Sequence, residues 1–225
     1  MTELFGVEKC VGQILLNFGI VKDSELATYV NMLSEDFPDD PITTLPEMFK
    51  KINARLKAMG LQIRSLSVQE RVILDQNEEE EDEDEVPGDR LIRVMYHGIV
   101  NLEDDFAAEK FGTNLKADEL VFCKDCVERL VHNKYQSLHD LVYLSEHAKD
   151  CRQGWKSDME ALIGRLIDNK WLQRTDRAFV ELGPRAHLEL RPLIESTTLQ
   201  MVVGEEGDGD LAQELLGQLP QIIFH

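Results

Sequence analysis

The spacing of apolar residues changes between residues 158 and 194, and this change predicts three consecutive elements. The first is a helix, whose apolar face comprises Met159, Leu162, Ile163, Leu166 and Ile167. Residues 171–174 and 178–182 flank a polar turn and predict a β-hairpin, with Trp171 joining it to the core. After Gly183-Pro184, a second amphipathic helix runs through Ala186, Leu190, Leu193 and Ile194. Helix, hairpin and closing helix are typical of the end of a winged-helix domain.

The first part of the chain shows a related pattern. Helical spacing predicts helices over residues 7–18, 24–33 and 45–61, with Ser24 as an N-cap. Two extended segments rich in branched residues follow, Arg64 to Leu74 and Arg90 to Val100. Between them lies an acidic block, 78–85, whose like charges repel one another and favour a solvated loop. Three helices and a hairpin with an enlarged tip indicate another winged helix.

The second of these modules begins with a helix from about Asn114, through Leu120, Cys123, Val127 and Leu130. Ser137 is placed to cap a short helix, and the pattern at Asp158 completes the module. The predicted fold is therefore α+β, mainly α, with tandem winged helices. The first domain covers 1–110 with an acidic insertion at 76–89, the second covers 111–196, and an acidic tail with a short apolar segment covers 197–225.

The charge is −19, and this argues against a dedicated nucleic-acid binder because phosphate contacts need cations. The acidic block and the acids at 205–210 account for much of this negative charge. The rest of the chain is nearly balanced and has local basic patches that are candidates for nucleic-acid contact. No apolar run is long enough to span a membrane, and the start of the chain does not resemble a signal peptide. Four cysteines without an export signal indicate reduced thiols in the cytosol or nucleus.

Two groups of cations are candidates for weak DNA contact, with a solvated helix face as the alternative for each. The helix before the wing of a winged helix usually enters the major groove. In the first module that helix carries Lys50, Lys51, Arg55 and Lys57. In the second module the candidates lie in and after the hairpin: Arg174, Arg177 and Arg185.

One metal-ligand pattern is present. Cys123-x-x-Cys126 followed by His147-x-x-x-Cys151 has the spacing of a Cys₃His zinc site. The cysteines fall within a helical pattern, and no Gly or Pro between them supplies a turn, so two buried core thiols are the preferred interpretation. No phosphate-binding glycine loop or catalytic constellation is evident, and we expect neither a cofactor nor a catalytic residue.

Several strings resemble the non-structural maintenance of chromosomes element 1 family, the RING-type subunit of the Smc five/six complex. They cover 45–63 (LPEMFKKINARLKAMGLQI), 93–111 (RVMYHGIVNLEDDFAAEKF) and 167–194 (IDNKWLQRTDRAFVELGPRAHLELRPLI). The resemblance implies a nuclear, chromosome-associated protein that acts in DNA repair and recombination. It also implies two partners, a MAGE-type winged-helix subunit and the kleisin of the complex.

The chain departs from this family after residue 196. Family members usually continue into a zinc-binding RING-like domain, which supports ubiquitin transfer. Residues 197–225 contain no cysteine and a single histidine, too few donors for tetrahedral zinc sites. We therefore expect a non-catalytic scaffold subunit. The alternatives are a ubiquitin-ligase subunit whose RING is missing here, and an independent winged-helix DNA-binding protein.

Overall fold

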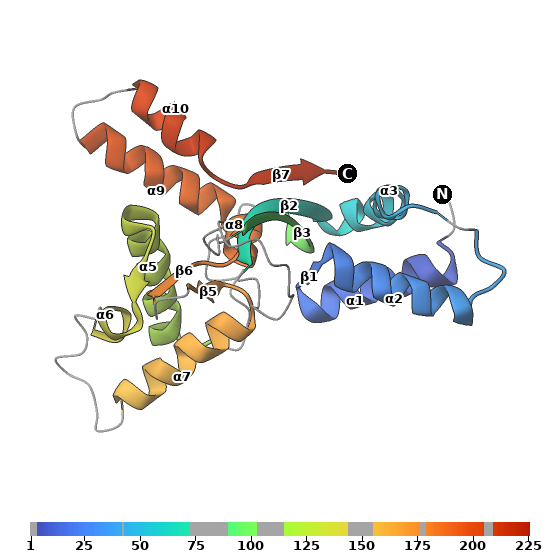
Figure 1. Ribbon diagram of the computed structural model, residues 1–225, viewed down its shortest axis with the longest axis horizontal. Helices are drawn as coiled ribbons and strands as arrows, with labels where there is room; N and C mark the ends of the chain where they lie inside the picture. Colours follow the sequence, from blue (N-terminus) through green and yellow to red (C-terminus); the bar gives the residue numbers. More distant parts are fainter. Residues whose placement is uncertain are drawn as a thin grey trace, which may run out of the picture.

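The computed structural model describes residues 4–41, 43–72, 90–102, 115–143, 155–175, 179–204 and 209–225. These residues form a mixed α+β structure that is mostly helical, with two small antiparallel sheets (Figure 1). One sheet has the strand order β1-β3-β2-β7 and the other β4-β6-β5. Within these ranges no helix is long and apolar enough to cross a membrane.

The first module contains the predicted helices and hairpin. Its elements are α1 (Gly6–Phe18), β1 (Ile20–Lys22), α2 (Asp23–Asp36), α3 (Leu45–Leu56), the 3₁₀ turn η1 (Lys57–Met59), β2 (Leu61–Val72) and β3 (Arg90–Asn101). The short strand β1 was not predicted. Ser24 is not the N-cap, because α2 begins at Asp23 and Lys22 precedes it. The third helix ends before residue 61, since Gly60 adopts the left-handed conformation (φ 68°) that terminates helices.

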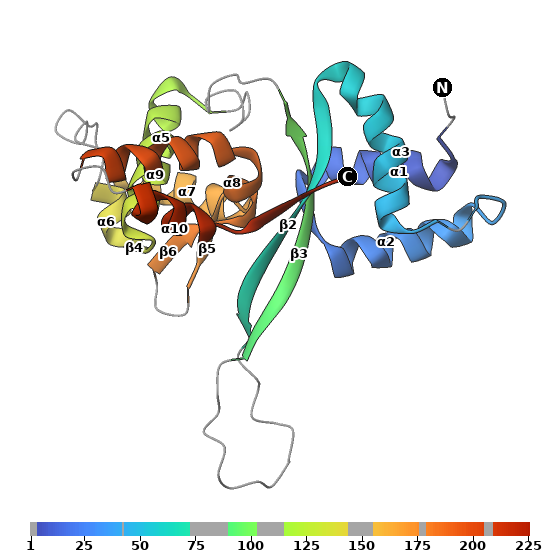
Figure 2. The same cartoon turned by 90° about the horizontal axis from the view of Figure 1, so that it is seen from above.

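The hairpin of the first module is a long two-stranded ribbon. Strands β2 and β3 pair antiparallel from Leu61 opposite Asn101 to Val72 opposite Arg90, so the two predicted extended segments are confirmed as strands. Figure 2 shows the ribbon projecting beyond the helices of both modules. The predicted acidic insertion, 76–89, lies outside the described residues.

The second module repeats this order of elements. It comprises α5 (Ala117–Asn133), β4 (Gln136–Ser137), α6 (Leu138–Tyr143), α7 (Trp155–Asp168), β5 (Leu172–Arg174) and β6 (Phe179–Leu182). The predicted cap is confirmed, since the Ser137 hydroxyl oxygen accepts a hydrogen bond from the Asp140 amide at 3.0 Å. Helix α7 begins earlier than predicted, at Trp155. Trp171 is buried in the core of this module, as expected.

The chain after the second hairpin is more structured than the sequence suggested. The predicted closing helix is two helices, α8 (Pro184–Glu189) and α9 (Arg191–Gly204). Pro192 lies in the first turn of α9, where its missing amide hydrogen costs little. Helix α9 continues through the boundary predicted at residue 196. Helix α10 (Gly209–Gly217) and strand β7 (Gln221–Phe224) follow it.

Both faces of the β2–β3 ribbon are covered near its base. Side chains alternate between faces along a strand, and Ile63 and Ile99 pack with the helices of the first module. The opposite face carries Leu66, Tyr96 and Val100, which form a separate cluster with Leu188 of α8. Helix α8 thus joins the second module to the back of the first module's sheet.

This junction depends on close approach at Gly98. A Cβ atom there would lie 2.8 Å from the Gly19 carbonyl oxygen and 2.8 Å from Leu188 Cδ2. Because one of these neighbours is backbone, the clash cannot be relieved by a side-chain rotation alone. Glycine at this position therefore allows β3, the turn after α1 and α8 to meet.

We predict that Gly98→Ala lowers the free energy of unfolding by about 1–3 kcal/mol, the usual range for overpacking. Urea denaturation followed by circular dichroism measures this. Gly164→Ala is the control, because nothing lies within 4 Å of its Cβ position and it sits inside a helix. Alanine there should stabilise by about 0.5–1 kcal/mol. Equal stability of Gly98→Ala and the wild type would contradict the packing described here.

Candidate functional site

The basic residues predicted in the first module lie on α3 and η1, the segment that precedes the ribbon. Met48, Phe49 and Ile52 face the core of this module. Lys50 and Lys57 are exposed, and Lys51 and Arg55 are partly exposed. The first turn of α3 adds one acid, Glu47, which bonds to the Thr44 amide, and this interaction lowers the pKa of Glu47. The outer surface of α3 is therefore mainly cationic.

Lys51 and Arg185, both predicted as DNA contacts, form ion pairs within the protein. Lys51 Nζ lies 2.7 Å from Glu8 Oε1, and Glu8 is buried. Arg185 Nε lies 2.6 Å from Glu189 Oε1, and its guanidinium stacks over Trp171 at 4.6 Å from the ring centroid. The Arg185 guanidinium also lies against Gly19 of the first module. Arg185 thus contributes to the module junction.

Arg174, the remaining predicted cation of the second module that the structure describes, lies on β5 and apart from α3 (Figures 1 and 2). Arg174 is exposed at the end of β5, and Arg177 lies outside the described residues. The exposed cations that the structure places together are therefore those of α3 and η1.

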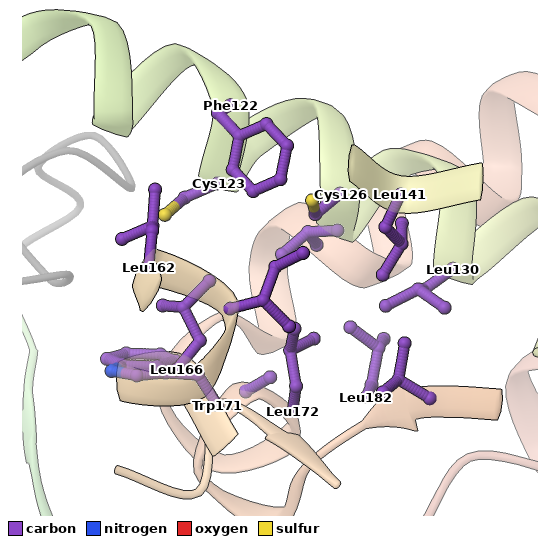
Figure 3. Close-up of a cluster of buried hydrophobic side chains, with 14 of the residues drawn as sticks. Phe122, Cys123, Cys126, Leu130, Leu141, Leu162, Leu166, Trp171, Leu172 and Leu182 are labelled. Carbon is purple, nitrogen blue, oxygen red and sulfur yellow. The ribbon is translucent and has the colours of Figure 1, made fainter. Parts of the chain in front are cut away.

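The two cysteines of the possible zinc pattern are core residues of α5. Figure 3 shows Cys123 and Cys126 directed into a cluster that includes Leu141, Leu162 and Leu166. Burial raises the pKa of the Cys123 thiol to about 12, and it raises the pKa of Cys126 well above its ordinary value. His147 and Cys151 lie outside the described residues. The structure thus supports core packing for the two described thiols.

We predict that Cys123 and Cys126 resist alkylation in the folded protein. The thiolate is the reactive form, and a pKa near 12 makes it scarce at pH 8, so alkylation should be at least about 100-fold slower than for an ordinary thiol. Iodoacetamide labelling followed by peptide mass spectrometry measures the rates. The partly exposed Cys10 serves as the internal comparison. Labelling of Cys123 as fast as that of Cys10 would contradict the buried environment.

A line of four hydrogen-bonded polar side chains crosses the core-facing side of the ribbon, with Ser65 and His97 buried at its centre and Asp23 exposed at one end. Asp23 Oδ1 lies 2.9 Å from His97 Nε2, and His97 Nδ1 lies 2.7 Å from Ser65 Oγ. Ser65 Oγ is also 2.5 Å from Nε2 of His225. Ser65 and His97 are directly opposite in the β2–β3 ladder. We call these four residues the polar line.

The hydrogen-bond directions along the polar line follow from its carboxylate. Burial lowers the pKa of His97, so its imidazole is neutral near pH 7. The Asp23 carboxylate can only accept, so His97 donates from Nε2 and accepts at Nδ1 from the Ser65 hydroxyl. The Ser65 oxygen then accepts from Nε2–H of His225. Every group at the centre of the line is satisfied.

The polar line combines Asp, His and Ser, but its geometry does not favour nucleophilic catalysis. Ser65 is fully buried, and the His225 ring occupies the remaining side of its hydroxyl. A nucleophile must be able to reach the reacting atom of a substrate. No pattern in the sequence predicted this cluster. Its only local signals were polar residues at core-facing positions of two predicted strands.

The zinc chemistry of a RING does not fit the described part of the chain after residue 196. Residues 197–204 and 209–225 form the rest of α9, then α10 and β7. The histidine in this segment, His225, is bonded to Ser65. No group of three or more His, Cys, Asp or Glu side chains suited to a metal occurs among the residues the structure describes.

A comparison with known protein families identifies the family of this chain. The sequence model described as "Nse1 non-SMC component of SMC5-6 complex" matches residues 8–155. The chain belongs to this Nse1 family. The match covers the first module, its ribbon and the first part of the second module, so the predicted resemblance is confirmed. A comparison with curated protein sequences gives no match.

A solved structure extends the likeness in fold to most of the chain. A chain of the structure described as "Nse1-Nse3-Nse4 complex" is 16% identical, with a TM-score of 0.64, over 89% of this chain and 78% of that chain. At this identity the likeness concerns the fold. It includes regions beyond residue 155, where the Nse1 family match ends.

Proposed function

We propose that this Nse1-family chain is a non-catalytic scaffold subunit of the SMC5-6 complex. In this proposal it pairs with Nse3, a MAGE-type subunit, and contacts the kleisin, Nse4, on chromosomes in the nucleus during DNA repair and recombination. The family match over residues 8–155 carries the proposal. The fold likeness to a chain of the Nse1-Nse3-Nse4 complex supports the choice of partners.

We also propose that each module is a winged helix, the first within residues 1–110 and the second within 111–196. The supporting observation is the order helix, strand, helix, helix, strand, strand, which occurs in both modules. Each module also has its own apolar cluster. Winged helices serve as protein-binding as well as DNA-binding modules, which suits a scaffold.

A candidate surface for Nse3 lies where α1 meets α2. The rings of Phe18 and Tyr29 stack with centroids 6.1 Å apart. Phe18 is 59% exposed, and Met32, one turn from Tyr29 on α2, is 61% exposed. Aromatic and methionine side chains are enriched at the centres of interfaces, where they account for much of the binding energy.

We predict a stable one-to-one complex when this chain is co-expressed with Nse3 of the same organism. Size-exclusion chromatography with light scattering measures the stoichiometry. Phe18→Asp with Met32→Asp should weaken the complex at least about tenfold, because it places charges in an apolar contact. Met59→Asp is the control, since Met59 is equally exposed, at 62%, but lies on η1. Separate peaks for the two wild-type proteins would refute the pairing.

DNA contact is a second candidate function, favoured by the cationic outer surface of α3 and η1. The exposed Lys50 and Lys57 are its main residues, with Arg55 beside them and Arg174 as a separate candidate. Arg185 is not a candidate for DNA contact, because it is held between Glu189 and Trp171. With a net charge of −19, contact with phosphates must be local and sensitive to salt.

We predict that the wild-type chain binds duplex DNA weakly and that Lys50→Glu reduces this binding. The plot of log affinity against log salt concentration has a negative slope. Each lost phosphate contact should reduce the magnitude of this slope by about 0.9. Fluorescence anisotropy between 50 and 200 mM salt measures the slope. Lys9→Glu, an exposed position on α1, makes the same charge change elsewhere. If the two variants behave alike, the surface of α3 does not contact DNA.

A further inference from the structure

The end of the chain returns to the first module. Strand β7 adds to the free edge of β2, where Phe224 lies opposite Arg64 and Gln221 opposite Ser67. Figures 1 and 2 both show β7 leaving the helices of the second module and running beside β2 toward α3. The four-stranded sheet therefore contains strands from both ends of the chain.

His225, which follows β7, lies among side chains of the first module that together form its pocket. The side-chain amide of Asn53 donates to the His225 carbonyl oxygen at 3.1 Å and to the Ile63 carbonyl oxygen at 3.1 Å. The imidazole bonds to Ser65 and packs edge-on against Phe49, with ring centroids 5.0 Å apart. Phe49 also contacts the ring of His97, again with centroids 5.0 Å apart. The first module thus contacts the backbone carbonyl, the ring and a ring nitrogen of His225.

We propose that the edge of β2 and this pocket form a binding site for an extended peptide that presents a histidine side chain. The ligand is the chain's own segment 221–225, which acts as a releasable clasp between the two modules. Strand addition supplies sequence-independent main-chain bonds, and the pocket supplies the side-chain selectivity.

The segment before β7 is attached to the second module. Leu219 packs against the core of that module, and Arg191 Nη1 donates to the Pro220 carbonyl oxygen at 2.8 Å. From Gln221 onward the strand pairs with β2 of the first module, and Ile222 packs against the apolar cluster that includes Leu188 of α8. The clasp therefore fastens the modules together beside the α8 junction and shares part of its apolar cluster.

The contacts of the clasp are small enough to open locally. Strand β7 pairs over four residues, whereas β2 and β3 pair over twelve. Phe224 is 64% exposed, and its ring is covered on one side by the Arg64 guanidinium at 4.9 Å. Short edge segments with few hydrogen bonds open at much lower free-energy cost than a central ladder.

The site nevertheless favours an occupant over water. Without β7, β2 would present unpaired backbone groups at residues 64–67, an edge suited to another strand. The Ser65 hydroxyl would lose the donor that it accepts from, and the carbonyl-binding amide of Asn53 would lose one of its two acceptors. Leaving buried polar groups without hydrogen-bond partners costs free energy. Release of the segment therefore favours binding of a peptide that supplies these partners again.

A labelled peptide tests the site in the intact 225-residue chain. The probe is fluorescein-labelled Leu-Pro-Gln-Ile-Ile-Phe-His, the sequence of residues 219–225. The receptor carries Ile223→Asp and His225→Ala, which displace its own strand. We expect saturable binding to this variant, and at least about tenfold weaker binding to the wild type, because the attached strand competes at high effective concentration.

Two altered probes distinguish specific recognition of the histidine from nonspecific binding. Replacing the histidine of the probe by alanine should weaken binding about tenfold, since the bond to Ser65 and the contact with Phe49 are lost. Replacing its phenylalanine by alanine should change affinity less than about threefold, because that side chain is largely exposed. Equal affinity for the wild type and the variant, or no effect of removing the histidine, would overturn the proposal.

Hydrogen exchange of the wild type tests release without any substitution. Amides of residues 222–224 should exchange at least about tenfold faster than those of Tyr96 to Val100 in the central ladder, since only the clasp opens. If both sets exchange at the same rate, the segment separates only on global unfolding. That result would refute a releasable clasp even if the receptor variant failed to fold.

Discussion

The β2–β3 ribbon carries apolar side chains on both faces of its base, and the rest of the structure depends on covering them. Alternation along the strands directs Ile63 and Ile99 to one side and Leu66, Tyr96 and Val100 to the other. Helices α1 to α3 cover the first side, but among its described residues the first module has no further element for the second. Helix α8 supplies it, with Leu188 at the contact. The two modules are joined because one sheet serves both.

Two polar residues lie on the core-facing side of the same ribbon. They require hydrogen-bond partners from other segments, and residue 225 is one of these partners. Ser65 and His97 face each other in the ladder and are buried, so each needs partners from elsewhere. Asp23 at the start of α2 supplies one and His225 supplies the other. The polar line thus links four segments that are distant in sequence. It also explains why the C-terminal segment lies on the first module.

These two constraints leave particular surfaces available for partners. The outer surface of α3 and the apolar surface between α1 and α2 are both outside the junction. The tip-proximal part of the ribbon carries Leu91, 58% exposed, at a distance from either core. A scaffold with its modules held at fixed positions can present such surfaces in a defined relation to each other. The proposed scaffold role depends on this property.

The sequence by itself determined the local elements, because their causes are local. Helical spacing located α1, α3, α5 and α7, branched residues around the acidic block located the ribbon, and Ser137 marked the start of α6. It also indicated that Cys123 and Cys126 are core thiols, since both lie on the apolar face of one helix. The family resemblance rested on such local strings as well.

Only the tertiary structure decided which elements meet. Strands β1 and β4 are too short to show a period, and β7 becomes a strand by pairing with β2. The sequence predicted Arg185 as a candidate DNA contact. In the structure its guanidinium stacks on Trp171 at the junction. The polar line joins residues from 23 to 225, and no local pattern records contacts at that separation. Their positions follow from how the sheet is covered, which is a property of the whole fold.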